Sequence, residues 1–418
     1  MRARSARPGG GIRRGVAVIA VAAAGGGLAG CGGGARPAAG RAAVPVALPL
    51  ATSGPAGAVT WAVIPMGTAA PGAGRVWELV TLAGGARWTV ATPPAVSTSG
   101  AIAVTAGRGG SLLAAIRPRQ ALRFSPVTGT PDGGRTWVPG NPAPGLAAVP
   151  DALAAAPDGR RLIALAHGPG GPAIAIQSRS PAGRPAAGGG LVPAGPWTTL
   201  AGRTGLAASP AGRACGVTAL TAAAFSPAGR PVLGADCRRP GVAGILAGPP
   251  GGWQLAGPPV PAGLRGDLVR VLRLTLAAGR LTALLQAGAG RAAVLVAAWT
   301  AGGGAWTVSA PLPLRGAAVS STSFGGDGSA AVELGGRRAM LVAGPAGAGP
   351  PAGAGAAGRA WRRLPALPAA PHVTLAVAGD GDVMALATDG SVLMVWQLSR
   401  DGGGWLRAQR VVVPVPDG

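Results

Sequence analysis

The feature that most constrains the fold of this chain is a repeat of about fifty residues. Tryptophans recur at intervals of 44 to 60 residues, most of them after a glycine-rich turn: Trp88, Trp137, Trp197, Trp253, Trp306, Trp361 and Trp405. A second series of turn glycines alternates with them without a break: Gly57, Gly109, Gly159, Gly229, Gly279, Gly328 and Gly381. Such a pattern predicts a chain built from repeated small structural units.

The last repeat shows what one unit contains. Four strand-like segments, HVTLAVA, DVMALAT, SVLMVWQLS and WLRAQRVVV, are separated by the turn sequences GDG, DG and RDGGG. Four short strands in about fifty residues is the spacing of one blade of a β-propeller. We therefore predict an all-β propeller domain over residues 45–418, with seven four-stranded blades and with six or eight blades as alternatives.

The composition is unusual, because 76 of the 418 residues are glycine and 42 are proline. Such a content raises the question of disorder. The regular alternation of tryptophans and turn glycines argues against it, since a low-complexity coil would keep no period. All 37 basic residues are arginine. We attribute this bias to GC-rich codons, as in an actinobacterial genome, rather than to function.

One turn carries a more specific motif. The segment TPDGGRTW places Thr130, Asp132, Gly134, Thr136 and Trp137 in the pattern Ser/Thr-x-Asp-x-Gly-x-Thr-Trp, and SRDGGGW repeats it in a shorter form with Ser399, Asp401 and Trp405. In these segments the chain resembles the Asp-box, or BNR-repeat, propellers, which include sialidases. The resemblance implies that both segments are turns before an outermost strand, and that the tryptophan packs between blades. It also implies that Asp132 and Asp401 hold the turns rather than act as catalytic acids.

The N-terminus carries the features of an export signal. Five arginines precede the short apolar segment VAVIAVAAA, and the sequence LAGC ends at Cys31. This arrangement resembles the lipobox of bacterial lipoproteins. It implies a signal peptide over residues 1–30, lipid attachment at Cys31, a flexible linker over residues 31–44, and a protein held at the outer face of the cytoplasmic membrane. Sec and Tat export both remain open.

Two further cysteines flank a predicted hairpin. Two apolar runs separate Cys215 and Cys237 from the turn SPAG at residues 226–229. Folding at this turn brings the cysteines nearly opposite each other, and an even pair suits an oxidising compartment. We expect a disulfide, with two buried free thiols as the alternative.

The residues for several kinds of chemistry are missing or scattered. The chain has no tyrosine, which sialidases use as their nucleophile, so sialidase activity is not expected. Its 13 acidic residues lie mostly in turns, although a pair of carboxylates would be needed for other glycosidases. The two histidines, His167 and His372, are far apart, and we expect them at strand or loop ends. We assign no catalytic residue, metal or cofactor.

Function can be predicted only as a class. The formal charge of +24 favours anionic surfaces such as lipid headgroups or wall polymers, and clusters such as Arg265, Arg270 and Arg273 would form an anion pocket if they faced one mouth. Scattered, solvated arginines are the alternative. We expect a monomeric, non-catalytic binding or scaffolding module with an envelope protein or anionic polymer as partner, and no nucleic acid. The alternative is an envelope glycosidase. Paired carboxylates at the central mouth would favour the enzyme, and an apolar or arginine-lined mouth would favour binding.

Overall fold

The computed structural model describes residues 51–67, 76–84, 87–93, 99–118, 127–139, 150–167, 173–179, 197–249, 252–300, 304–335, 338–344 and 359–413. The chain divides into two units, Met1–Val46 and Ala47–Gly418, and every described residue belongs to the second. The expected signal peptide, Cys31 and the linker therefore lie outside the described residues. In the part of the chain that is described, no helix is long and apolar enough to cross a membrane.

The described residues form short strands that follow one another in runs of four, and each strand pairs antiparallel with the next in its run. The first runs are β1 (Ala51–Ala56), β2 (Val59–Met66), β3 (Val76–Ala83) and β4 (Arg87–Val90), then β5 (Ser99–Ala106), β6 (Leu112–Pro118), β7 (Val127–Thr130) and β8 (Val138–Pro139), then β9 (Ala152–Ala155), β10 (Arg161–His167), β11 (Ala173–Arg179) and β12 (Trp197–Gly202).

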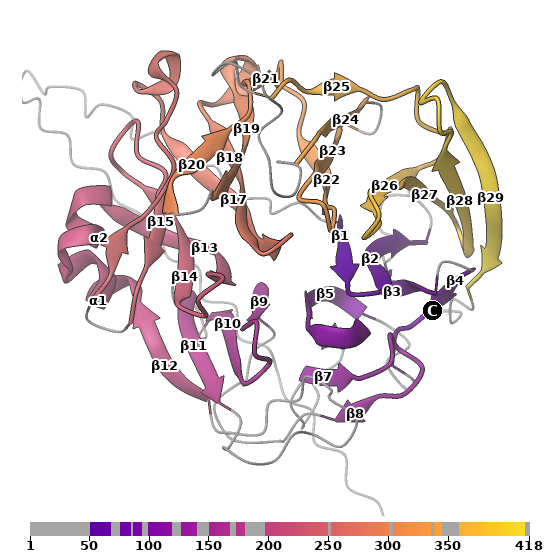
Figure 1. Ribbon diagram of the computed structural model, residues 1–418, viewed down its shortest axis with the longest axis horizontal. Helices are drawn as coiled ribbons and strands as arrows, with labels where there is room; N and C mark the ends of the chain where they lie inside the picture. The colour runs from indigo at the N-terminus through magenta and orange to yellow at the C-terminus, as the bar shows by residue number, and fades with distance from the viewer. Residues whose placement is uncertain are drawn as a thin grey trace, which may run out of the picture. The chain divides into compact units, whose positions relative to one another are not determined.

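The later runs repeat this arrangement, as the progression from β1 to β29 in Figure 1 shows. They are β13 (Val217–Phe225), β14 (Pro231–Cys237), β15 (Gly244–Ala247) and β16 (Gln254–Leu255), then β17 (Val269–Ala277), β18 (Arg280–Ala287), β19 (Val294–Thr300) and β20 (Trp306–Val308), then β22 (Val319–Phe324), β23 (Ala330–Leu334), β24 (Arg338–Val342) and β25 (Arg362–Arg363), then β26 (His372–Val377), β27 (Val383–Asp389), β28 (Val392–Leu398) and β29 (Trp405–Val412). Strand β21 (Leu312–Pro313) pairs with β19 outside this order.

Neighbouring runs pack face to face through buried apolar side chains. Leu113 of β6 and Leu162 of β10 share one such cluster, and Leu165 of β10 and Leu233 of β14 share the next. The series continues along the chain until Leu386 of β27 packs with Ile64 of β2, so the last run also packs against the first. A closed series of four-stranded sheets that pack face to face is a β-propeller. This confirms the expected fold class.

Polar contacts accompany the packing where the last run meets the first. The side-chain amide of Gln409 accepts a hydrogen bond from the Trp88 backbone N–H (2.8 Å) and donates one to the Trp88 carbonyl (2.9 Å). The Thr388 hydroxyl donates to the carbonyl of Pro65 (2.8 Å), and Gly67 pairs with Gly390 in an isolated bridge. The chain therefore closes on itself without exchanging a strand between the two runs.

Both repeats predicted from the sequence fall at fixed places in the runs. Each tryptophan of the series lies at the first or second position of a fourth strand or immediately precedes it, and packs in the apolar cluster shared with the preceding run. Each glycine of the second series lies in the hairpin between a first and a second strand, with a positive φ angle that glycine adopts without strain. The sequence repeat is thus the structural repeat.

A short helical insertion precedes β13. Helix α1 (Arg203–Ala208) and helix α2 (Pro210–Cys215) meet at Ser209, whose hydroxyl caps α2 by accepting a hydrogen bond from the Gly212 N–H (3.0 Å). The described residues also include the short 3₁₀ turns η1 (Arg108–Gly110), η2 (Ala262–Leu264) and η3 (Gly290–Ala292). The insertion was not predicted, although its Ser-Pro pair is a helix-start signal.

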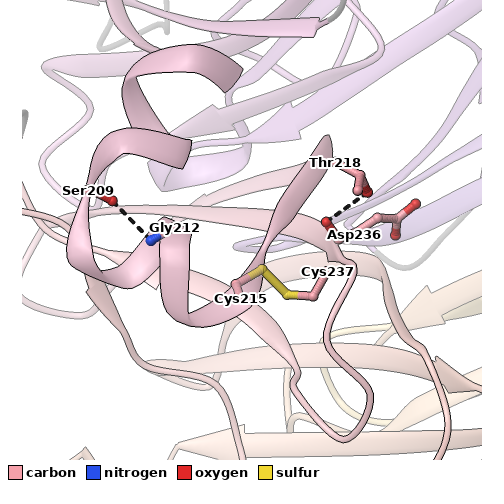
Figure 2. Close-up of a disulfide and its surroundings, with 6 residues drawn as sticks. All are labelled: Ser209, Gly212, Cys215, Thr218, Asp236 and Cys237. Carbon is pink, nitrogen blue, oxygen red and sulfur yellow. Dashed lines mark hydrogen bonds between the residues drawn. A yellow bond between two sulfur atoms is a disulfide. The ribbon is translucent and has the colours of Figure 1, made fainter.

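A disulfide ties this insertion to the hairpin that follows it. Cys215, the last residue of α2, is bonded to Cys237 at the end of β14, with 5.0 Å between their Cα atoms (Figure 2). The turn at Ser226–Gly229 joins β13 to β14 as expected, and Val217 lies opposite Cys237. The predicted disulfide across the base of the hairpin is therefore present, in place of two free thiols.

Candidate functional site

The first strands of the runs surround a cavity of about 670 Å³. Its wall comes mainly from β9 and from the carboxyl-terminal halves of β1, β5, β13 and β17, and is completed by Phe324, Gly326 and Gly379. Small-molecule sites in proteins commonly occupy about 300–1,000 Å³. The cavity is therefore large enough for a small organic ligand.

Short side chains create this space. The segments that form the wall read ALAA in β9, TAAAF at residues 221–225 and IAVTA at residues 102–106, so alanine occupies most of the positions. An alanine side chain fills far less of the central space than the valine, leucine or isoleucine common elsewhere in these strands. Trp61, Phe225 and Phe324 are the aromatic residues of the wall. Most side chains of the described wall are apolar, although polar and apolar atoms share its exposed surface about equally.

Arg273 of β17 brings a positive charge into this apolar wall. Its Nη1 donates to the carbonyl (2.9 Å) and hydroxyl (3.2 Å) of Thr322 on β22, and its Nη2 donates to the carbonyl of Ser53 on β1 (2.8 Å). The guanidinium lies over the rings of Phe324 (5.0 Å) and Trp61 (5.9 Å), at distances suited to cation–π attraction. Burial lowers the pKa of Arg273 to about 10, so the side chain stays charged at neutral pH.

A cluster of hydroxyls fixes the strands that hold Arg273. Strands β1 and β22 pair in parallel, with Thr52 opposite Thr322, which joins two runs into an eight-stranded sheet. The Ser53 and Ser323 hydroxyls lie 2.7 Å apart, and the Ser53 hydroxyl also donates to the Leu375 carbonyl of β26 (2.7 Å). The Ser321 hydroxyl accepts from the Leu375 N–H (3.0 Å). These bonds take the place of a regular ladder between β22 and β26 and hold the acceptors of Arg273 in position.

The other polar side chains of the described wall are four threonines and one aspartate: Thr52, Thr105, Thr221, Thr275 and Asp151. The Thr105 hydroxyl already has a partner within the protein, since it accepts a hydrogen bond from the Ala155 N–H (3.2 Å). Thr221 of β13 is only 7% exposed, and its hydroxyl has no hydrogen-bond partner. Asp151, immediately before β9, is the one acidic residue among the described residues that line the cavity. The Thr221 oxygen is itself shielded from solvent, so it is a buried, costly hydroxyl of the strand rather than a contact for a ligand.

The buried carboxylates of the described region lie outside this wall. Burial raises the pKa of Glu78, although a hydrogen bond from the Thr92 hydroxyl lowers it in part. Burial also raises the pKa of Asp236, which Arg270 opposes through an ion pair at 3.4 Å. Neither residue lines the cavity, and Glu333 does not line it either. The described wall therefore does not bring two carboxylates together.

The turn at residues 130–137 is held by its own polar side chains. The Thr136 N–H (2.9 Å) and hydroxyl (2.7 Å) both donate to the Asp132 carboxylate. The Thr130 hydroxyl donates to the same carboxylate (2.8 Å) and accepts from the Gly134 N–H (2.8 Å). Desolvation opposes ionisation, but these bonds outweigh it and lower the pKa of Asp132 to about 2. The turn joins β7 to β8, where Trp137 packs, partly exposed, against the cluster between the first two runs.

The shorter motif forms the corresponding turn between β28 and β29. The Ser399 hydroxyl donates to the Asp401 carboxylate and accepts from the Gly404 N–H (3.0 Å), while the Gly403 N–H donates to the same carboxylate (3.0 Å). The Ser399 hydrogen bond is the main cause that lowers the pKa of Asp401. Trp405 packs, partly exposed, beside β26–β28. Both aspartates thus serve their turns and take no part in the cavity.

The other sequence candidates separate in space. His167 ends β10 and His372 begins β26, as expected, and within the described ranges no three His, Cys, Asp or Glu side chains gather as metal ligands would. Of the expected arginine cluster, Arg265 is exposed, Arg270 pairs with Asp236, and Arg273 lines the cavity. Arg273 was thus singled out only as a member of that cluster. The sequence could not show that Arg273 alone of the three lines the cavity, because spacing along the chain does not reveal which strands a side chain contacts.

Comparisons with known proteins leave the function open. No protein family model matches the chain. No curated protein matches it either. Among solved structures, a protein of Bacteroides uniformis ATCC 8492 described as a candidate 6-phosphogluconolactonase is 15% identical, with 85% of this chain and 97% of that chain covered and a TM-score of 0.47.

Two further structures are described as propellers. The β-propeller domain of Cps50 from Myceliophteria thermophila is 13% identical over 82% of this chain and 90% of that chain, with a TM-score of 0.43. The lectin of Aleuria aurantia, described as a six-bladed propeller that recognises fucose, is 12% identical over 88% and 96%, with a TM-score of 0.36. All three TM-scores lie below 0.5, so these likenesses assign no function to this chain.

Proposed function

We propose that this chain is a lipid-anchored, extracytoplasmic propeller that binds a small molecule in its central cavity without transforming it. The observation that carries the proposal is this cavity, whose described lining side chains are apolar apart from a few hydroxyls, one cation and one acid. Ligand sites commonly combine an apolar lining with a few polar groups that fix orientation. An envelope glycosidase would need two facing carboxylates, and Asp151 has no acidic neighbour in the described wall.

The proposed architecture is a seven-bladed propeller of the Asp-box type. Each four-stranded run counts as one blade, and the fourth-strand tryptophans support this count. The hydrogen bonds of Asp132 and Asp401 support the resemblance to Asp-box proteins. The packing of the last run against the first within one chain supports the proposal that the protein acts as a monomer. Its partner is a component of the envelope, and nucleic acid is not one.

Ligand-observed NMR on the purified full-length protein tests the binding function. A mixed library of neutral and charged fragments should give saturation transfer from the protein to a subset of compounds. The matched control is Thr275→Trp, because Thr275 is a partly exposed residue of the cavity wall and a larger side chain there would fill the space. Signals that persist unchanged in this variant would place binding elsewhere and overturn the proposal.

The lipid anchor has a test of its own. Mass spectrometry of the membrane-extracted protein should find a diacylglyceryl group on an N-terminal Cys31, and the Cys31→Ser variant should move to the soluble fraction. A mature chain that begins at another residue would refute the anchor without affecting the binding proposal.

A further inference from the structure

We propose that Arg273 is the specificity-determining residue of the central cavity and selects a small organic oxyanion, a carboxylate or phosphate monoester on an apolar body. This inference rests on the proposed binding function and adds the chemical class of the ligand. Its starting point is the charge balance of β17. Arg270 of this strand is neutralised by the Asp236 carboxylate at 3.4 Å. Arg273, three residues later, contacts only neutral oxygens of Thr322 and Ser53.

The geometry leaves part of the guanidinium available. A guanidinium has five N–H donors. Two Nη1 contacts and one Nη2 contact go to protein oxygens, and no acceptor for Nε or for the second Nη2 hydrogen occurs among the described residues. Arginine recognises carboxylates and phosphates with two parallel N–H donors, and an Nε–Nη2 pair can supply them. The bonds to Thr322 and Ser53 hold the planar group in place before a ligand arrives.

The surroundings increase the benefit of an incoming anion. Arg273 lies against the rings of Phe324 and Trp61, where its charge is only partly solvated. An unpaired charge in an apolar wall is costly, and an anionic partner reduces that cost through a charge-assisted hydrogen bond. Most other side chains of the described wall are apolar, which suits an apolar body better than a second charge.

A structural role for Arg273 is the competing explanation. The side chain joins β17 to β22 and β1, so it also fastens three first strands together. A purely structural arginine would lower stability when replaced but would give the wild-type protein no preference for anions. Selectivity between matched charged and neutral ligands therefore separates the two roles.

Isothermal titration calorimetry at low ionic strength provides this test on the full-length protein. Hexanoate and phenyl phosphate are the two anionic probes, and hexanamide and phenol are their neutral counterparts. We expect at least one anionic probe to bind tenfold or more tightly than its neutral counterpart. The probe that binds identifies the carboxylate or the phosphate ester as the source of the oxyanion.

Three variants assign the effect to the cavity. Arg273→Lys keeps the charge but loses the planar pair of donors, and should weaken binding of the anion at least tenfold. Thr275→Trp enlarges a partly exposed side chain of the cavity wall and should block binding of anionic and neutral probes alike. Arg265→Ala removes an exposed arginine outside the cavity wall and should leave the affinity unchanged.

The outcomes also separate this inference from the proposed function. If neutral and anionic probes bind equally, and Thr275→Trp blocks both, the cavity binds ligands but anion selection is wrong. If Arg265→Ala weakens binding as much as Arg273→Lys, the effect is general electrostatic attraction and the inference is overturned. If no fragment or probe binds the wild-type protein, both the inference and the proposed function fail.

Discussion

Removing the Cys215–Cys237 bond should destabilise the propeller by a predictable amount. The two cysteines are separated by 22 positions, and a loop of this length corresponds to about 3 kcal/mol on the chain-entropy account of disulfides. Both side chains are buried, with 0% and 5% exposure, so replacing them by alanine also removes apolar contacts in the cluster that includes Leu206 and Leu233. We therefore expect a loss of about 3 kcal/mol or somewhat more in the Cys215→Ala/Cys237→Ala variant.

The expected change in melting temperature follows from the size of the domain. Unfolding entropy is about 2.1 cal/mol/K per residue, so the unit Ala47–Gly418 gives roughly 0.8 kcal/mol/K. A loss of about 3 kcal/mol then lowers the Tm by about 4 °C. Differential scanning fluorimetry checks this, and reductant should lower the Tm of the wild-type protein but not that of the double variant.

A local measurement shows where the bond acts. The disulfide holds α2 against the β13–β14 hairpin, and α2 contains Arg213, a trypsin site. Without the bond, cleavage after Arg213 should accelerate relative to cleavage elsewhere in the chain. A double variant with an unchanged Tm and an unchanged tryptic pattern would refute the reasoning, because the bond would then constrain neither the unfolded chain nor the insertion.

Three further outcomes are expected. Trp137→Ala should lower the free energy of unfolding, measured by chemical denaturation, by about 2–3 kcal/mol. This is less than for a fully buried tryptophan, because the ring is partly exposed. An unchanged denaturation midpoint would show that the motif does not stabilise the protein. The fold lowers the pKa of Asp132 to about 2, so the charged carboxylate stabilises the protein above pH 4. This contribution is lost as the pH falls towards 2. The Asp132→Asn variant should therefore lose less stability than the wild type between pH 7 and 2.5. The purified protein should release no product from a fluorogenic sialoside, since the chain has no tyrosine nucleophile, and turnover that survives removal of contaminating enzymes would contradict this.

The sequence was most informative where the fold depends on local chemistry. Turn glycines with positive φ angles and tryptophans at fourth strands are determined within a few residues of chain, so their period located the strands of each run. The disulfide was predictable for the same reason, since the SPAG turn at residues 226–229 sets the pairing of β13 with β14. Each of these features depends on short-range geometry that amino-acid type alone restricts.

Contacts between segments far apart in the chain could not be predicted from the sequence. The parallel pairing of β1 with β22 joins residues about 270 positions apart, such as Ser53 and Ser323. No local sequence pattern in either strand predicts this pairing. The same applies to Arg273, whose acceptors come from β1 and β22. Alternation of apolar and polar residues predicts that a strand has faces, but it does not identify the strands that those faces meet.

In the proposed function, the contrast between Arg270 and Arg273 makes the central cavity, rather than the net charge of the chain, the source of selectivity. Most arginines of this protein can be solvated singly, and a charge of +24 would attract any anionic surface without discrimination. Arg270 adds no selectivity, because Asp236 already neutralises it. Arg273 differs, because its orientation is fixed by Ser53 and Thr322 while part of its donor set remains unused. Oriented, partly desolvated donors discriminate between ligands by geometry, which scattered surface charges do not.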